Sequence, residues 1–237
     1  MLASDVISQC RSALVEPVQG FWSDAELLGW INRAERDFAN RTHIFQQIAI
    51  TSTVAGQITY ALPANLLSVR ALMYNNIQTA SLVAASPNWI RLVPSNMEKY
   101  AQETPNFLSN TTDTLNFPRK YAIWNNELYL YPPPVQGGSS DLQLFYIAHP
   151  VPIIDVTQNL NLDDAFEDGI IAYVLSKAFQ KENELDKMKD QDQIYTNYVK
   201  LGLRMAKKQS GDQRYKLDIS SPQPFEGPFD RRFNPLA

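Results

Sequence analysis

The residues able to do acid–base, nucleophilic or metal chemistry are few in this sequence and widely separated. It has two histidines, His43 and His149, and a single cysteine, Cys10. Neither histidine has a cysteine, aspartate or glutamate at the spacing of a metal site. Cys10 falls on the apolar side of a predicted helix, where cysteine behaves as a small core residue. We therefore expect all three side chains to be structural.

The sequence also lacks the common catalytic and nucleotide-binding motifs. It contains no P-loop, no G-x-G-x-x-G and no G-x-S-x-G. Asp155, Thr157, Asn159 and Asn161 resemble the start of a calcium-binding loop. Such a loop needs glycine where Leu160 stands and glutamate where Phe166 stands, so the pattern fails twice. We expect no catalytic residue, no cofactor and no metal, and therefore a protein that is not an enzyme.

Composition and charge describe an ordinary globular chain. Of its 237 residues, 44% are hydrophobic and 19% are charged, which suffices for a core without disulfide bonds. No secretory signal begins the chain, and no apolar run approaches the roughly 18 residues of a membrane span. The net charge of −4 gives no general attraction for nucleic acid. We expect a soluble protein from a reducing compartment.

The best-specified helix runs from Phe21 to Asn40. Ser23 and Glu26 have the spacing of a capping box, in which each side chain binds a free backbone N–H of the first turn. A shorter helix over residues 4–15, capped by Ser4, precedes it, and the two are predicted to lie antiparallel. Four apolar residues recur at helical spacing and define the buried stripe of the longer helix: Leu27, Ile31, Ala34 and Phe38.

From Gln46 the apolar period changes from about four to two, which indicates strands. Residues 48–54 and 58–62 are predicted to form a hairpin around Ala55-Gly56. A clearer hairpin joins residues 120–124 to 127–131 through Asn125-Asn126, a pair that tolerates the positive φ angles of tight turns. Other predicted elements are strands over residues 67–73 and 142–148, and a short helix capped by Ser95 that ends near residue 102.

Helical periodicity returns near the C-terminus. Asp164 and Glu167 repeat the capping pattern, and a second helix follows from Leu185. Beyond Gly211 we expect no periodicity, and prolines forbid a continuous helix. This tail either folds back on its own domain or is a docking arm that orders on binding. The side chains that would anchor such an arm are Phe225, Phe229, Arg231, Arg232 and Phe233.

Each end of the chain thus supplies two helices, with a β region between them. We predict an α+β fold in which residues 1–45 and 151–210 form a four-helix bundle. Residues 46–150 form an inserted small antiparallel β domain, and residues 211–237 form an extended C-terminal arm.

Three stretches, in this order, resemble the head-to-tail adaptor (connector) proteins of tailed bacteriophages: FWSDAELLGWINRAERDFA, WNNELYLYPPP and LDDAFEDGIIAYVLSKAFQKENE. The resemblance reaches to about Met205. It implies a structural protein of the virion neck, made in the bacterial host cytoplasm, that forms a dodecameric ring beneath the portal protein. The ring would extend the DNA channel and give the tail tube or nozzle protein an attachment surface. Genomic DNA would pass through the lumen without sequence-specific binding, and the arm would dock onto the portal or a neighbouring subunit.

Other functions are also compatible with parts of the sequence. A neck stopper or tail-completion protein would occupy the next ring down. A carbohydrate-binding module of a phage tail would use a platform of aromatic side chains. A DNA-binding regulator would need a basic recognition helix, for which Lys207-Lys208 is too short. The candidate platform residues are Tyr121, Trp124, Tyr129, Tyr131 and Tyr146.

Overall fold

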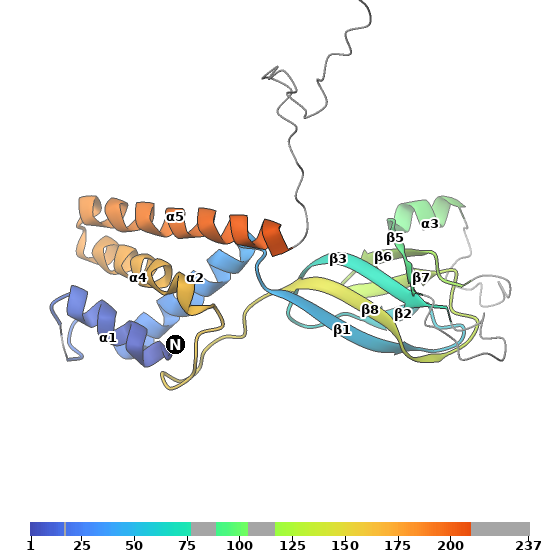
Figure 1. Ribbon diagram of the computed structural model, residues 1–237, viewed down its shortest axis with the longest axis horizontal. Coiled ribbons are helices and arrows are strands. Elements are labelled where there is room, and N and C mark those ends of the chain that lie inside the picture. Colours follow the sequence, from blue (N-terminus) through green and yellow to red (C-terminus); the bar gives the residue numbers. More distant parts are fainter. Residues whose placement is uncertain (17, 77–88, 104–116, 210–237) are drawn as a thin grey trace, which may run out of the picture.

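The computed structural model describes residues 1–16, 18–76, 89–103 and 117–209. Within these ranges the fold is mixed α+β, with five α-helices and two small sheets. The helices are α1 (Ala3–Ala13), α2 (Asp24–Thr42), α3 (Met97–Glu103), α4 (Glu167–Glu182) and α5 (Leu185–Gln209). Figure 1 shows α1, α2, α4 and α5 at one end of the molecule, and the sheets with the short helix α3 at the other.

Helices α1, α2, α4 and α5 pack around one apolar core. The predicted stripe of α2, from Leu27 to Phe38, has no exposed side-chain surface and faces this core. Ser23 caps α2, and its side chain accepts a hydrogen bond from the N–H of Glu26 at 3.2 Å. The Glu26 carboxylate instead binds Lys181 of α4 at 2.8 Å. The Ser23 half of the predicted capping box is thus present, while Glu26 joins two helices.

Helix α5 approaches α2 closely at Gly202. A Cβ atom at this position would lie 2.6 Å from Cζ of Phe38 and 2.9 Å from Cγ2 of Thr42. The sequence suggests only that glycine weakens the helix here. The structure adds that the missing side chain lets the two helices touch.

We expect alanine to change the free energy of unfolding in opposite directions at two helical glycines, Gly202 and Gly29. Gly202→Ala should lower the free energy of unfolding by about 1–3 kcal/mol, because overpacking outweighs the gain in helix propensity. Gly29→Ala in α2 is the matched control, since nothing lies within 4 Å of its Cβ position. It should raise the free energy of unfolding by about 0.5–1 kcal/mol. Urea denaturation of both variants measures the difference, and a stabilised Gly202→Ala would contradict the close approach.

Two four-stranded sheets face each other at the other end. The first has the order β1 (Gln46–Thr53), β8 (Gly138–Ala148), β3 (Leu66–Asn75) and β4 (Trp89–Arg91). The second has the order β2 (Thr59–Ala61), β7 (Glu127–Tyr131), β6 (Lys120–Trp124) and β5 (Val93–Pro94). Leucines and tyrosines from both sheets form the second core.

One predicted hairpin is confirmed and the other is wrong. β6 pairs with β7 around Asn125 and Asn126, whose φ angles are 49° and 60°. The strand after Ala55-Gly56, however, does not return along β1, because β1 pairs with β8 and β2 pairs with β7. The chain crosses from one sheet to the other at that turn. Alternation predicts a strand and its two faces, but it does not identify the partner strand.

Three predicted helix starts are displaced by one to three residues. Ser4 lies inside α1, which begins at Ala3. Asn96, rather than Ser95, caps α3 by accepting a hydrogen bond from the N–H of Lys99 at 2.8 Å. Asp163, rather than Asp164, accepts from the N–H of Ala165 at 3.0 Å and begins a short 3₁₀ turn (Asp164–Phe166) before α4. In the last two cases the residue beside the predicted cap has an equally suitable side chain.

Candidate docking surfaces

The anchors predicted for the C-terminal arm, Phe225, Phe229, Arg231, Arg232 and Phe233, lie outside the described residues. In the described part of the chain, candidate contact sites are groups of exposed apolar side chains on ordered elements. Three such groups stand out, on the first sheet, on the segment between β8 and α4, and on the loop between α1 and α2.

The first group lies on the face of the first sheet that points away from the second sheet. The strand register places Ile48 beside Phe145, Phe145 beside Ala71, and Met73 beside Arg91. We call this surface the outer sheet face; its residues are Ile48, Ile50, Ala71, Met73, Trp89, Arg91, Gln143 and Phe145.

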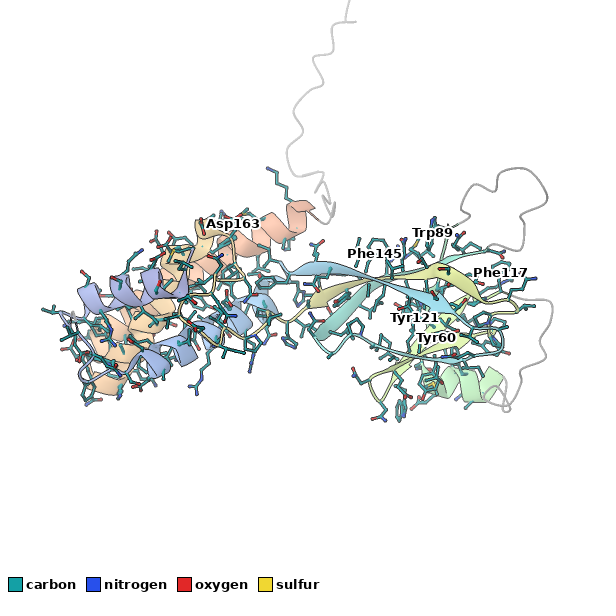
Figure 2. The ribbon with its side chains drawn as sticks, turned by 90° about the horizontal axis from the view of Figure 1, so that it is seen from below. Tyr60, Trp89, Phe117, Tyr121, Phe145 and Asp163 are labelled. Carbon is teal, nitrogen blue, oxygen red and sulfur yellow. The ribbon has the colours of Figure 1, made fainter. Side chains whose placement is uncertain are left out.

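Six of the eight residues of the outer sheet face are apolar, although they take no part in the core between the sheets. The alternate residues of the same strands, such as Leu72 and Leu144, fill the core between the sheets. Figure 2 shows Phe145 and Trp89 on the opposite side of the first sheet from Tyr60 and Tyr121. Ile48 and Ile50 are 58% and 57% exposed. Antiparallel sheets usually place polar residues on a solvated face, so this exposed apolar face is a candidate contact surface.

The second group lies on residues 149–163, which we call the connection because they lead from β8 back to the helices. Two side chains of α2 hold it in place. The Asn32 side chain accepts from the N–H of Ile153 at 2.7 Å and donates to its carbonyl oxygen at 2.9 Å. The Glu35 carboxylate accepts from the N–H of Asn161 at 2.7 Å, from its Nδ2 at 2.7 Å and from the N–H of Leu162 at 3.2 Å.

Glu35 is a buried acid without a cationic partner in any of these contacts. Its side chain is only 1% exposed. Desolvation by burial raises the pKa of Glu35 above its ordinary value, and the three hydrogen bonds from Asn161 and Leu162 oppose that rise. The carboxyl group therefore serves as a fixed acceptor that aligns backbone donors of the connection.

The connection also binds α1 through its backbone. The carbonyl oxygens of Gln158 and Val156 accept from the N–H groups of Ala3 and Ser4 at 2.9 and 2.8 Å. These donors belong to the first turn of α1, which has no acceptors of its own for them. Held on both helices, the connection exposes Val151 and Ile154, which are 65% and 85% accessible.

The third group lies on the loop between α1 and α2, at the end of the helices remote from the sheets (Figure 1). Arg11 fixes this loop, because its Nη2 donates to Asp24 at 2.6 Å and to the carbonyl oxygen of Trp22 at 2.9 Å. The loop exposes Val18 and Phe21, and Lys181 lies 4.6 Å from the centre of the Phe21 ring.

The structure does not assemble the predicted aromatic platform. Tyr121 and Tyr146 are buried in the core between the sheets. Tyr129 and Tyr131 pack instead near α3, where the Tyr131 ring lies 5.4 Å from that of Tyr100. Trp124 is exposed. The aromatic residues therefore pack mainly as internal contacts, and they do not form one binding surface.

The candidate chemical residues have structural surroundings. Burial raises the pKa of Cys10 to about 12, so the sulfur is held as a neutral thiol. His43 ends α2 in a left-handed conformation. Asp155 accepts hydrogen bonds from the N–H and hydroxyl of Thr157, which lower its pKa. Within the described ranges no group of three His, Cys, Asp or Glu side chains is placed to hold a metal ion.

Comparison with known proteins places this architecture in a family. A family model described as SU10 adaptor protein matches residues 1–222, which include every helix and strand in the described part of the chain. The chain belongs to the SU10 adaptor protein family. No curated protein matches it.

Membership of the SU10 adaptor family is consistent with the resemblance to phage adaptor proteins. An adaptor family implies interaction with other phage head and tail proteins, and it fits a position at the virion neck. Among the described helices, none is both long and apolar enough to span a membrane.

The sequence did not predict the surfaces that this adaptor chain exposes on its described elements. Ile48 and Ile50 were recognisable as one face of a strand, but not as the face turned away from the core. Glu35 carried a usable signal, because it lies four residues after Ile31 and three before Phe38, on the apolar side of α2. An acid at such a position is buried only when other groups satisfy it.

Proposed function

We propose that the protein is a structural head-to-tail adaptor of a tailed phage. It forms a dodecameric ring beneath the portal protein, extends the DNA channel and gives the tail tube or nozzle protein an attachment surface. The observation that carries this proposal is the family match over residues 1–222. In the ring, α1, α2, α4 and α5 act as a four-helix bundle. The role involves no catalysis, cofactor or metal.

The outer sheet face is the surface through which one copy contacts the next. In a ring, every copy makes the same contact with the next copy. That contact joins one patch of each copy to a different patch of its neighbour, and the outer sheet face is one of these two patches. Ile48 and Ile50 supply exposed apolar surface on a rigid strand, so little conformational entropy is lost when they are covered. A second copy is the occupant that this proposal requires.

The C-terminal arm attaches the ring to the portal or to a neighbouring subunit. Phe225, Phe229 and Phe233 are aromatic anchors, and Arg231 and Arg232 add charged contacts. The chain has a net charge of −4, which disfavours adhesion to phosphate. Genomic DNA would therefore slide through the lumen without sequence-specific binding.

Electron microscopy of the purified chain, alone and mixed with the portal protein of the same genome, tests the proposal. We expect an added ring layer on the portal, with the rotational symmetry of a dodecamer. A variant lacking residues 211–237 should keep its helical circular dichroism and lose attachment. A portal left bare by the intact chain would contradict the adaptor role, and normal attachment of the truncated variant would contradict the role of the arm.

A further inference from the structure

An apolar groove opens between the two sheets, along the side where β1 and β2 form their edges. It has a volume of about 250 Å³. Leu142 and Leu144 of β8 line it from the first sheet, and Leu128 of β7 lines it from the second, together with Leu62, which directly follows β2. Ala49 and Thr51 form its rim on β1. A groove of this shape suits a segment that presents apolar side chains on one face only.

β1 is the longest edge strand of the two sheets. It has eight residues, and in the described part of the chain it pairs only with β8. Its sequence, QQIAITST, contains no charge and no proline. The other edges are short, at two or three residues, and β5 contains Pro94. Long edge strands without charges or proline readily accept another strand. The open edge of β1 is therefore a candidate site for pairing with an additional strand.

The C-terminal segment of the same chain begins next to this edge. Gly202 of α5 lies against Thr42, four residues before β1 begins. α5 continues to Gln209, about 10 Å further along its axis. In both views the end of α5 and the start of β1 lie side by side (Figures 1 and 2).

The residues that follow α5 have the pattern of a half-buried strand. Although the tail as a whole has no sustained period beyond Gly211, one stretch of five residues alternates. Tyr215, Leu217 and Ile219 alternate with Lys216 and Asp218. Residues 210–214 can span up to about 17 Å, which is ample for a short connection.

We propose that residues 215–219 pair with the open edge of β1 in the same chain and close the groove. The segment enters at the start of β1 and therefore runs parallel to it. Tyr215, Leu217 and Ile219 face the groove, while Lys216 and Asp218 face solvent. This inference goes beyond the adaptor role and does not rest on it. It leaves Phe225, Phe229 and Phe233 available for docking.

Amide hydrogen exchange tests the pairing. The intact chain should protect residues 46–53, and a variant lacking residues 210–237 should exchange them about tenfold faster or more, with α2 unchanged. Leu217→Ser should reproduce part of this loss, because it removes a groove-facing side chain. Lys216→Ser, the matched control, should not. Unchanged exchange of β1 after the deletion, or equal effects of the two serine variants, would overturn the proposal.

A disulfide distinguishes the same chain from a second copy. In a Cys10→Ala background, Thr51→Cys combined with Leu217→Cys should form a bond within one chain on oxidation. A linked dimer as the main product would overturn the same-chain assignment. A variant lacking only residues 221–237 separates this proposal from the adaptor role, because it should lose portal attachment and keep β1 protected. Loss of β1 protection in that variant would count against the assignment to residues 215–219.

Discussion

Replacing Glu35 with alanine should lower the free energy of unfolding by about 3 kcal/mol or more. The carboxylate, whose residue is 1% exposed, accepts two hydrogen bonds from Asn161 at the surface and one from the buried Leu162. Alanine leaves the backbone N–H groups of Asn161 and Leu162 without their acceptor, while Nδ2 of Asn161 keeps its hydrogen bond to the carbonyl oxygen of Val151. Each unsatisfied buried group costs about 1–3 kcal/mol. Urea denaturation followed by tryptophan fluorescence measures the loss. Glu26→Ala, which removes a partly exposed ion pair from the same helix, should cost about 1 kcal/mol or less.

Glu35→Gln separates the charge of this residue from its shape. Burial raises the pKa of Glu35 above its ordinary 4.5, so the folded state holds the proton more tightly than the unfolded state does. The stability that this proton contributes is complete below pH 4.5 and is lost as the pH rises through the pKa of the folded protein. The advantage of wild type over Glu35→Gln should therefore be larger at pH 4.5 than at pH 8. An advantage that grows with pH would show that Glu35 is held as a stabilised anion instead.

The parts of the fold that the sequence predicted well are those that local interactions determine. The stripe of α2 and the hairpin at Asn125-Asn126 depend on neighbours within a few residues. The pairing of β1 with β8 joins residues more than 80 positions apart, and the sequence of neither strand identifies its partner. Because β1 and β2 alternate equally well, a turn between them looks like a hairpin from sequence alone.

The candidate contact surfaces were harder to predict for a related reason. Three phenylalanines near the C-terminus predict a contact from the sequence alone, because aromatic side chains have little use in a solvated tail. Val151 and Ile154 lie on a connection that carries no periodic signal, and the side chains that fix it, Asn32 and Glu35, come from α2. Only the folded chain brings these residues together. Exposure of an apolar side chain is thus a property of tertiary packing rather than of its local sequence.

Converting Ile48 and Ile50 to aspartate should prevent ring assembly. Both side chains are more than half exposed. The two substitutions together should therefore lower the free energy of unfolding of the monomer by only about 1–2 kcal/mol, mainly through the lower strand propensity of aspartate. In the proposed ring both positions are covered by the next copy, and two carboxylates would have to lose their hydration against apolar surface. Association should weaken about a hundredfold or more, which corresponds to roughly 2.8 kcal/mol per contact. Light scattering and negative-stain microscopy would record monomers in place of rings.

The control for this prediction is Val93→Asp in β5. Val93 is 58% exposed, as Ile48 is, but it lies on the second sheet, away from the outer sheet face. Val93→Asp adds one negative charge to an exposed strand, as Ile48→Asp alone does, so a general effect of charge or solubility would act equally on these two single variants. Selective loss of rings with Ile48 and Ile50 identifies the outer sheet face as the contact between copies. If rings persist when Ile48 and Ile50 are converted to aspartate, the outer sheet face is not the contact between copies. The next candidate is then the connection, which exposes Val151 and Ile154.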